Sequence, residues 1–114
     1  MDLVTKLQLR PGQGLRIVDA PEAFALQVEA SGDVAADGLL VFARTAADLA
    51  THSAEILAAA RSDRLTWVAY PKAGQLGTDL NRDRLAAALH EGGATPVRQV
   101  ALDETWSALR FRPA

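Results

Sequence analysis

The chain contains no cysteine among its 114 residues. This absence excludes disulfide scaffolding, thiolate zinc sites and cysteine nucleophiles together, and it fits a reducing compartment. Histidine is almost as scarce, and His52 and His90 each stand alone in a segment with helical periodicity, without a partner at metal-ligand spacing. The Gly-x-Ser-x-Gly pattern of a hydrolase nucleophile is also absent. We therefore predict neither a metal site nor a nucleophilic triad.

Long hydrophobic runs and a strong charge of one sign are absent as well. No window approaches the roughly 18 apolar residues of a membrane span, and the N-terminus MDLVTKLQLRPG lacks the apolar core of a signal peptide. A net charge of −2 supplies no general attraction for nucleic acid or an anionic membrane. The sequence predicts a soluble cytoplasmic protein without membrane attachment. Nucleic acid is not an expected partner, although Arg98, Arg110 and Arg112 could form a local basic stripe.

Length and composition indicate one globular domain over residues 1–114. A chain of this size buries enough surface on folding to form its own core. Its 49% hydrophobic and 23% charged residues are close to globular averages, which excludes extensive disorder and fibrous repeats.

Apolar runs predict three strands, at residues 15–18, 39–43 and 65–70. The continuous run LLVFA at 39–43 is typical of a strand covered on both faces. We expect the third strand to stop at Tyr70 because Pro71 has no N–H to continue a ladder. Two further extended runs, 96–102 and 105–112, are separated by a short polar joint and predict a terminal antiparallel hairpin.

Capping patterns predict the helices between these strands. Thr45 and Asp48 form a capping box for a helix that reaches about Arg61. Asn81 caps a second helix that ends at residues 92–93, and Pro21 opens a short helix over residues 22–29. Strands alternating with helices, followed by a hairpin, predict an α/β fold: a three-layer sandwich with a mostly parallel sheet.

This order of elements resembles the class I methyltransferase variety of the Rossmann fold, reduced in size, with two of its strands missing or compressed into residues 34–37. More specifically, VAYPK at 68–72, TDLNRD at 78–83 and PVRQVALDETWSALRFRP at 96–113 resemble a family of small bacterial proteins of unknown function. The resemblance implies a Rossmann-like fold and a bacterial origin, and it implies no activity.

The turn after the first strand departs from the methyltransferase pattern. The sequence reads Asp19-Ala20-Pro21-Glu22 where that family has a Gly-x-Gly turn. Glycines let backbone N–H groups approach the cofactor, whereas Pro21 removes a donor and Glu22 adds negative charge at a helix start. We therefore predict no S-adenosylmethionine binding, and no other cofactor is indicated.

Residues at the carboxyl ends of the predicted strands are candidate site residues, because ligands collect there in parallel α/β sheets. The candidates for ligand binding are Asp19, Arg44, Tyr70, Lys72, Gly74, Gly77 and Thr78. Lys72 would anchor an anion, and the amides of residues 74–78 would donate hydrogen bonds. The alternative is a structural ion-pair set at the sheet edge, with Gly74 and Gly77 serving only positive φ angles.

A second group, Asp103, Glu104, Thr105 and Trp106, has a simpler interpretation. Adjacent residues on an extended chain point to opposite faces, so the two carboxylates are not expected to act as a pair. A turn capped by one carboxylate, followed by a packing tryptophan, is the favoured interpretation.

Our leading functional hypothesis is a non-catalytic accessory domain that works through protein contact on a reduced methyltransferase-like scaffold. The alternative is a small-anion-binding protein, or a transferase-like enzyme, that uses the carboxyl ends of the strands. In that alternative Lys72 contacts the anion, and Tyr70 or Asp19 transfers a proton. An edge strand of the terminal hairpin could also pair with a second copy to form a homodimer.

Overall fold

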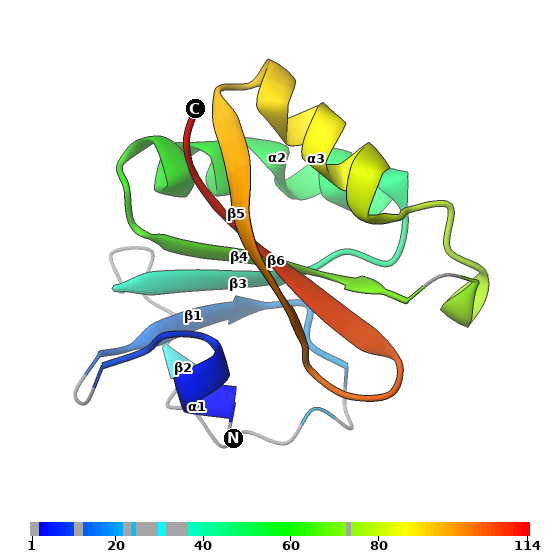
Figure 1. The fold of residues 1–114 in the computed structure, drawn as a ribbon, viewed down its shortest axis with the longest axis horizontal. Helices are drawn as coiled ribbons and strands as arrows, with labels where there is room; N and C mark the ends of the chain where they lie inside the picture. The colour runs from blue at the N-terminus through cyan, green and yellow to red at the C-terminus, as the bar shows by residue number, and fades with distance from the viewer. Residues whose placement is uncertain (1–2, 11–12, 22–23, 25–29, 32–36, 73) are drawn as a thin grey trace.

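A computed structural model describes residues 3–10, 13–21, 24, 30–31, 37–72 and 74–114. A six-stranded sheet in the order β2-β1-β3-β4-β6-β5 forms its centre (Figure 1). The strands are β1 (Leu15–Val18), β2 (Ala30–Ser31), β3 (Gly38–Phe42), β4 (Leu65–Pro71), β5 (Ala94–Ala101) and β6 (Trp106–Pro113). The helices are α1 (Leu3–Lys6), α2 (Ala46–Arg61) and α3 (Arg82–Glu91), with a 3-10 turn η1 (Gln75–Gly77) before α3.

The sheet is mixed, so the prediction of a mostly parallel, Rossmann-like sheet is wrong. Strands β2, β1, β3 and β4 are parallel, whereas β6 runs antiparallel to β4 and β5 antiparallel to β6. The antiparallel ladders are also the longest, with six residue pairs between β4 and β6 and seven between β5 and β6, against five between β3 and β4. The terminal hairpin was predicted. Its two strands are long enough that antiparallel residue pairs outnumber parallel pairs in the sheet, which makes the sheet mixed.

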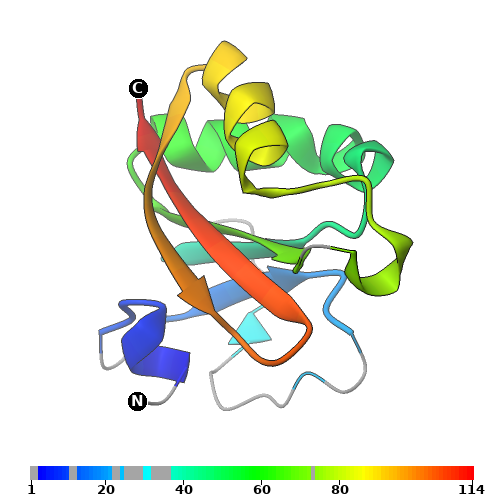
Figure 2. The same cartoon turned by 45° about the vertical axis from the view of Figure 1, so that its right-hand side comes forward.

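The predicted three-layer sandwich is also wrong for the described part of the chain. Both long helices, α2 and α3, lie on the same face of the sheet (Figures 1 and 2). On the opposite face the buried side chains of Leu7, Phe24 and Leu102, which lie outside the helices, pack on the sheet. The helix predicted at residues 22–29 and the strands expected at 34–37 lie almost entirely outside the described residues.

The central strands are buried on both faces, as the continuous apolar run at 39–43 predicted. Every residue of β3 is buried. Because successive strand residues point to opposite faces, Leu39 and Val41 pack with Ile56 of α2, whereas Leu40 and Phe42 pack with Trp67 on the other side. Two hydrophobic clusters, one on each face, therefore share the same sheet.

The predicted starts of the two long helices, α2 and α3, are confirmed. The Thr45 hydroxyl accepts a 3.2 Å hydrogen bond from the Asp48 N–H, and the Asn81 side chain accepts one of 2.9 Å from the Arg84 N–H. These bonds satisfy N–H groups that have no partner within the first helical turn. In the part of the chain that the structure describes, no helix is both long enough and apolar enough to cross a membrane.

Strand β4 continues through Pro71, so the predicted stop at Tyr70 is wrong. Pro71 pairs with Trp106, and the Lys72 N–H donates a 2.8 Å hydrogen bond to the Thr105 carbonyl oxygen. Successive N–H groups along a strand point to alternate neighbours. The position of the missing Pro71 N–H therefore faces the side of β3, where the last bond runs from the Ala43 N–H to the Ala69 carbonyl oxygen at 2.9 Å. The ladder to β6, on the other side of β4, does not need an N–H from Pro71.

Candidate functional site

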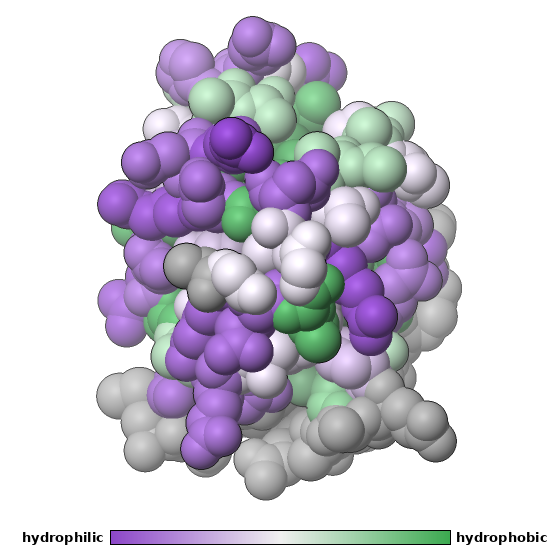
Figure 3. All heavy atoms as spheres, turned by 90° about the vertical axis from the view of Figure 1, so that its right-hand side faces the viewer, coloured by the Kyte–Doolittle hydropathy of each residue, from purple (hydrophilic) through white to green (hydrophobic). Residues whose placement is uncertain are grey.

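The parallel strands β1, β3 and β4 end at one edge of the sheet, and Figure 3 looks onto this side of the molecule. Most of the surface in that view is hydrophilic, with hydrophobic side chains in small separate groups. The seven predicted site residues do not form one site there. The structure divides them among a recess, two structural contacts and a loop.

Tyr70 and Lys72 lie in the recess, which we call the carboxyl-edge recess and which has a volume of about 330 Å³. Its lining comes from the end of β4, the start of α3 and the terminal hairpin: Tyr70, Lys72, Asn81, Arg82, Gln99 and Ser107. Two of these side chains are cationic and none is a carboxylate. The arrangement therefore favours a negatively charged ligand.

Tyr70 is a buried residue in the lining of the carboxyl-edge recess. Tyr70 is only 4% exposed, and the Gln99 side-chain amide donates a 3.0 Å hydrogen bond to its oxygen. Burial raises the pKa of Tyr70. The positive charge of Arg82 and a hydrogen bond with Ser107 offset part of that rise, and the negative charge of Asp83 adds to it. The hydroxyl therefore stays protonated at neutral pH and can donate a hydrogen bond to a ligand.

Asp19 lies away from this recess. Its carboxylate is 2.7 Å from Nε2 of His52 on α2, and its backbone has a φ of 58°. No partner for His52 could be predicted from local spacing, because the two residues are far apart along the chain. This contact joins the end of β1 to α2, and within the described residues no ion pair links Asp19 to Arg44 or Lys72.

Arg44 and Thr78 contact each other through the backbone. The Thr78 hydroxyl donates a 2.6 Å hydrogen bond to the Arg44 carbonyl oxygen and accepts one of 3.0 Å from the Leu80 N–H. The Arg44 N–H in turn donates to the Asp48 carboxylate at 3.0 Å. These bonds stabilise the connection between the start of α2 and the loop before α3, which is a structural role.

Gly74 and Gly77 have φ angles of 76° and 65°, and a Cβ placed at either would meet nothing within 4 Å. Both positions favour glycine because of their positive φ angles, and not because another group approaches closely. The structural alternative for this loop is therefore the one that the geometry favours. The amides of residues 74–78 that we predicted as anion donors belong to an exposed loop outside the lining of the carboxyl-edge recess.

The turn at residues 103–106 matches its predicted structural role. One carboxylate oxygen of Asp103 accepts 2.7 Å hydrogen bonds from the N–H groups of Thr105 and Trp106. Trp106 is 4% exposed, and its ring lies edge-on to Phe42 with centroids 5.0 Å apart. Asp103 therefore caps the turn, and Trp106 packs in the core.

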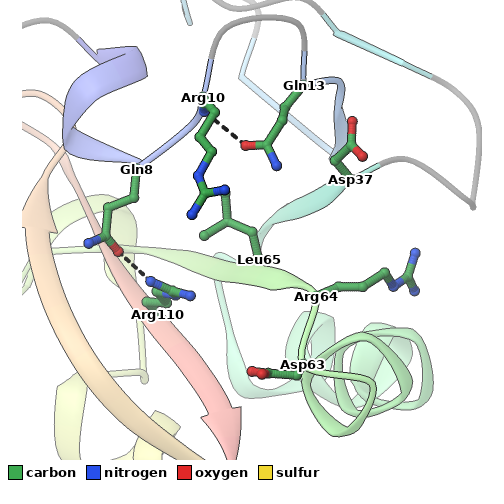
Figure 4. A pocket seen from close by; sticks show the side chains of 8 residues that line it. All are labelled: Gln8, Arg10, Gln13, Asp37, Asp63, Arg64, Leu65 and Arg110. Carbon is green, nitrogen blue, oxygen red and sulfur yellow. Dashed lines mark hydrogen bonds between the residues drawn. The ribbon is translucent and has the colours of Figure 1, made fainter.

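Two features escaped the sequence analysis. Arg82 enters the carboxyl-edge recess because it is the first residue of α3, and the predicted Asn81 cap already carried that signal. A larger pocket of about 680 Å³ lies at the opposite edge, where β3 and β4 begin (Figure 4). Its lining residues come from segments that are distant in sequence, so no local motif predicts this pocket.

Among the described residues, no group of three or more His, Cys, Asp or Glu side chains is arranged to hold a metal ion. Comparison with protein-family models finds no match, and comparisons with curated proteins and with solved structures find no significant match either. The resemblance to a bacterial family of unknown function therefore stays a prediction.

Proposed function

We propose that this protein is a binding domain for a small anion, which the carboxyl-edge recess holds between Lys72 and Arg82. The observation that carries the proposal is the presence of two cationic side chains and no carboxylate in one lining. An anion there neutralises like charges that the fold itself brings together at the start of α3.

The other lining groups suit the same ligand. Tyr70 and Ser107 supply hydroxyl groups, and Gln99 supplies an amide, so an oxyanion can receive neutral hydrogen bonds beside the two charged ones. A volume of about 330 Å³ is at the small end of ligand pockets. Inorganic phosphate, sulfate or a short carboxylate fits this size.

Binding without catalysis is the form of the proposal that the chemistry favours. Tyr70 stays protonated at neutral pH because burial raises its pKa, so it is a poor general base. Asp19, the other residue considered for proton transfer, contacts His52 and does not line the recess. A cytoplasmic location remains a prediction from the sequence.

Titration with inorganic phosphate tests the proposal. Lys72→Ala should leave the melting temperature without ligand nearly unchanged and should abolish the stabilisation by phosphate. Arg44→Gln is a matched control, because Arg44 is an exposed cation near the same edge but outside the recess. Wild-type protein that gains no stability from phosphate would refute the proposal. A Lys72→Ala protein that no longer folds would instead support a bracing role for Lys72.

Contact with a protein partner is the second candidate function, and one observation favours it. Strand β5 is an edge strand of the sheet, and Val97 on it is 50% exposed. A homodimer through this edge would place two β5 strands side by side. Pro96 and the register shift between Pro96 and Arg98 interrupt the edge, so only its second half offers a regular ladder. Light scattering tests whether the protein is a dimer.

A further inference from the structure

The pocket at the opposite edge of the sheet, which we call the amino-edge pocket, has a different chemistry. Three arginines, two aspartates, two glutamines and one leucine line it: Gln8, Arg10, Gln13, Asp37, Asp63, Arg64, Leu65 and Arg110. Its volume of about 680 Å³ lies within the range of sites for small organic ligands. Figure 4 shows Arg10 and Arg110 approaching its interior from different elements.

Arg110 is the most constrained of these side chains. One terminal nitrogen donates a 2.6 Å hydrogen bond to the Gln8 side-chain oxygen. Its Nε is buried, and among the described residues this nitrogen has no hydrogen-bond partner. A buried donor without an acceptor is costly, and it is uncommon in folded proteins. Burial also lowers the pKa of Arg110, and the charge of Arg112 adds to that effect, whereas the charge of Asp63 opposes it.

Gln8 is held in place at a cost in backbone conformation. Its φ is 61°, in the left-handed region that residues other than glycine rarely adopt. This backbone directs the Gln8 amide toward Arg110, as Figure 4 shows. Strained residues cluster at ligand sites, where the surrounding structure fixes them.

Both carboxylates of the amino-edge pocket are already occupied by other groups. Asp63 accepts two hydrogen bonds from Arg112, of 3.1 and 3.2 Å, and Asp37 accepts one of 2.9 Å from the Gly14 N–H. The guanidinium of Arg10 has no ionic or hydrogen-bonding partner among the described residues. Asp63 acts on Arg110 through its charge, but among the described residues neither Arg10 nor Arg110 forms an ion pair with a carboxylate.

We propose that the amino-edge pocket binds a small organic oxyanion, with its phosphate or carboxylate group held by Arg10 and Arg110. Guanidinium groups match the geometry of both head groups, because their N–H donors lie in a plane that two oxygens can accept from. The pocket is larger than a bare ion requires, so the rest of the ligand is a polar body that faces Gln13 and Asp37. This site is separate from the carboxyl-edge recess and does not depend on the function proposed for it.

NMR titration of the amide groups tests this proposal with two probes, inorganic phosphate and succinate, each at constant ionic strength. The amides of Gln8, Arg64 and Arg110 should shift and saturate with at least one probe, and the tighter probe identifies the preferred head group. Arg10→Gln should weaken binding about tenfold, the effect of losing one charge-assisted hydrogen bond. Arg10 is exposed, so this variant should stay folded.

Two variants separate the site from general charge effects. Arg110→Gln should weaken binding at least as much as Arg10→Gln, whereas Arg44→Gln, at the other edge of the sheet, should leave the affinity unchanged. The proposal fails if neither probe gives saturable shifts at these amides. It also fails if Arg10→Gln binds as tightly as the wild type. Lys72→Ala should not alter these shifts, so failure here is distinguishable from failure of the carboxyl-edge recess.

Discussion

The indole N–H of Trp67 donates a 3.0 Å hydrogen bond to the carbonyl oxygen of Leu7, 60 residues earlier in the chain. Both residues are fully buried. Without this bond the Leu7 carbonyl group would be buried without a hydrogen-bond partner. The bond also joins the turn after α1 to the centre of the sheet. Because Gln8 follows Leu7 directly, the same bond helps to position the amide that contacts Arg110.

We expect Trp67→Phe to lower the free energy of unfolding by roughly 2–4 kcal/mol, since it removes this hydrogen bond and leaves a cavity in the core. Urea denaturation measures the change. Trp106→Phe is the matched control, because Trp106 is also buried in the same cluster, at 4% exposed against 0% for Trp67, but its indole has no hydrogen bond among the described residues. It should cost about 1 kcal/mol less. Equal losses in the two variants would mean that the bond to Leu7 contributes nothing.

The contact between Arg16 of β1 and Glu55 of α2 predicts a pH dependence. Arg16 Nε lies 2.6 Å from a Glu55 carboxylate oxygen, and this hydrogen bond holds the pKa of Glu55 below its ordinary value near 4.5. A carboxyl group with a depressed pKa stabilises the folded state above its unfolded pKa and loses that effect as the pH falls through its folded pKa. The stability difference between wild type and Glu55→Gln should therefore be complete at neutral pH and disappear in acid.

Denaturation at a series of pH values measures this difference. Glu104→Gln is the control, because Glu104 is exposed in the turn between β5 and β6 and has no ion pair among the described residues. A Glu55→Gln difference that stays constant from neutral pH down to acid would contradict the prediction.

Gly92 is required for space and not for conformation. A Cβ at this position would overlap the side chain of Leu57 on α2, and the φ of −88° is open to any residue. Gly92→Ala should therefore lower the free energy of unfolding by about 1–3 kcal/mol through overpacking. The loss should shrink in a Leu57→Ala background, where the overlap is removed. Gly74→Ala, whose cost comes from positive φ alone, should cost the same in both backgrounds.

The predictions that succeeded depended on short stretches of sequence. Thr45 and Asn81 cap helices through bonds to residues three positions later, so a local pattern is sufficient to identify them. The apolar run at 39–43 likewise indicated burial on both faces without any knowledge of its neighbours. Asp103 caps its turn through bonds within the same four residues.

The predictions that failed depended on distant pairing. The sheet is mixed because β6 lies beside β4, and nothing in either strand specifies that neighbour. The seven candidate site residues do not form one site, because only Tyr70 and Lys72 line the recess, whereas Asp19 contacts His52 and Arg44 contacts Thr78 outside it, both across more than 30 positions. Pro71 continues its strand because its pairing with β6 needs no N–H from this residue, and only the fold decides on which side of β4 that neighbour lies.

By itself, the sequence determined the approximate positions of five strands, the starts of α2 and α3, the burial of the run at 39–43 on both faces, and that the chain has no cysteine chemistry. Those properties follow from side-chain periodicity, capping groups and composition, which act over a few residues. Only the tertiary structure decided the strand order, the side of the sheet on which α2 and α3 pack, and the grouping of charges at the two edges. Arg10 and Arg110 line one pocket only when the sheet is assembled, because they come from opposite ends of the chain. Lys72 and Arg82 flank a single loop, but their recess is completed by Gln99 and Ser107 of the terminal hairpin.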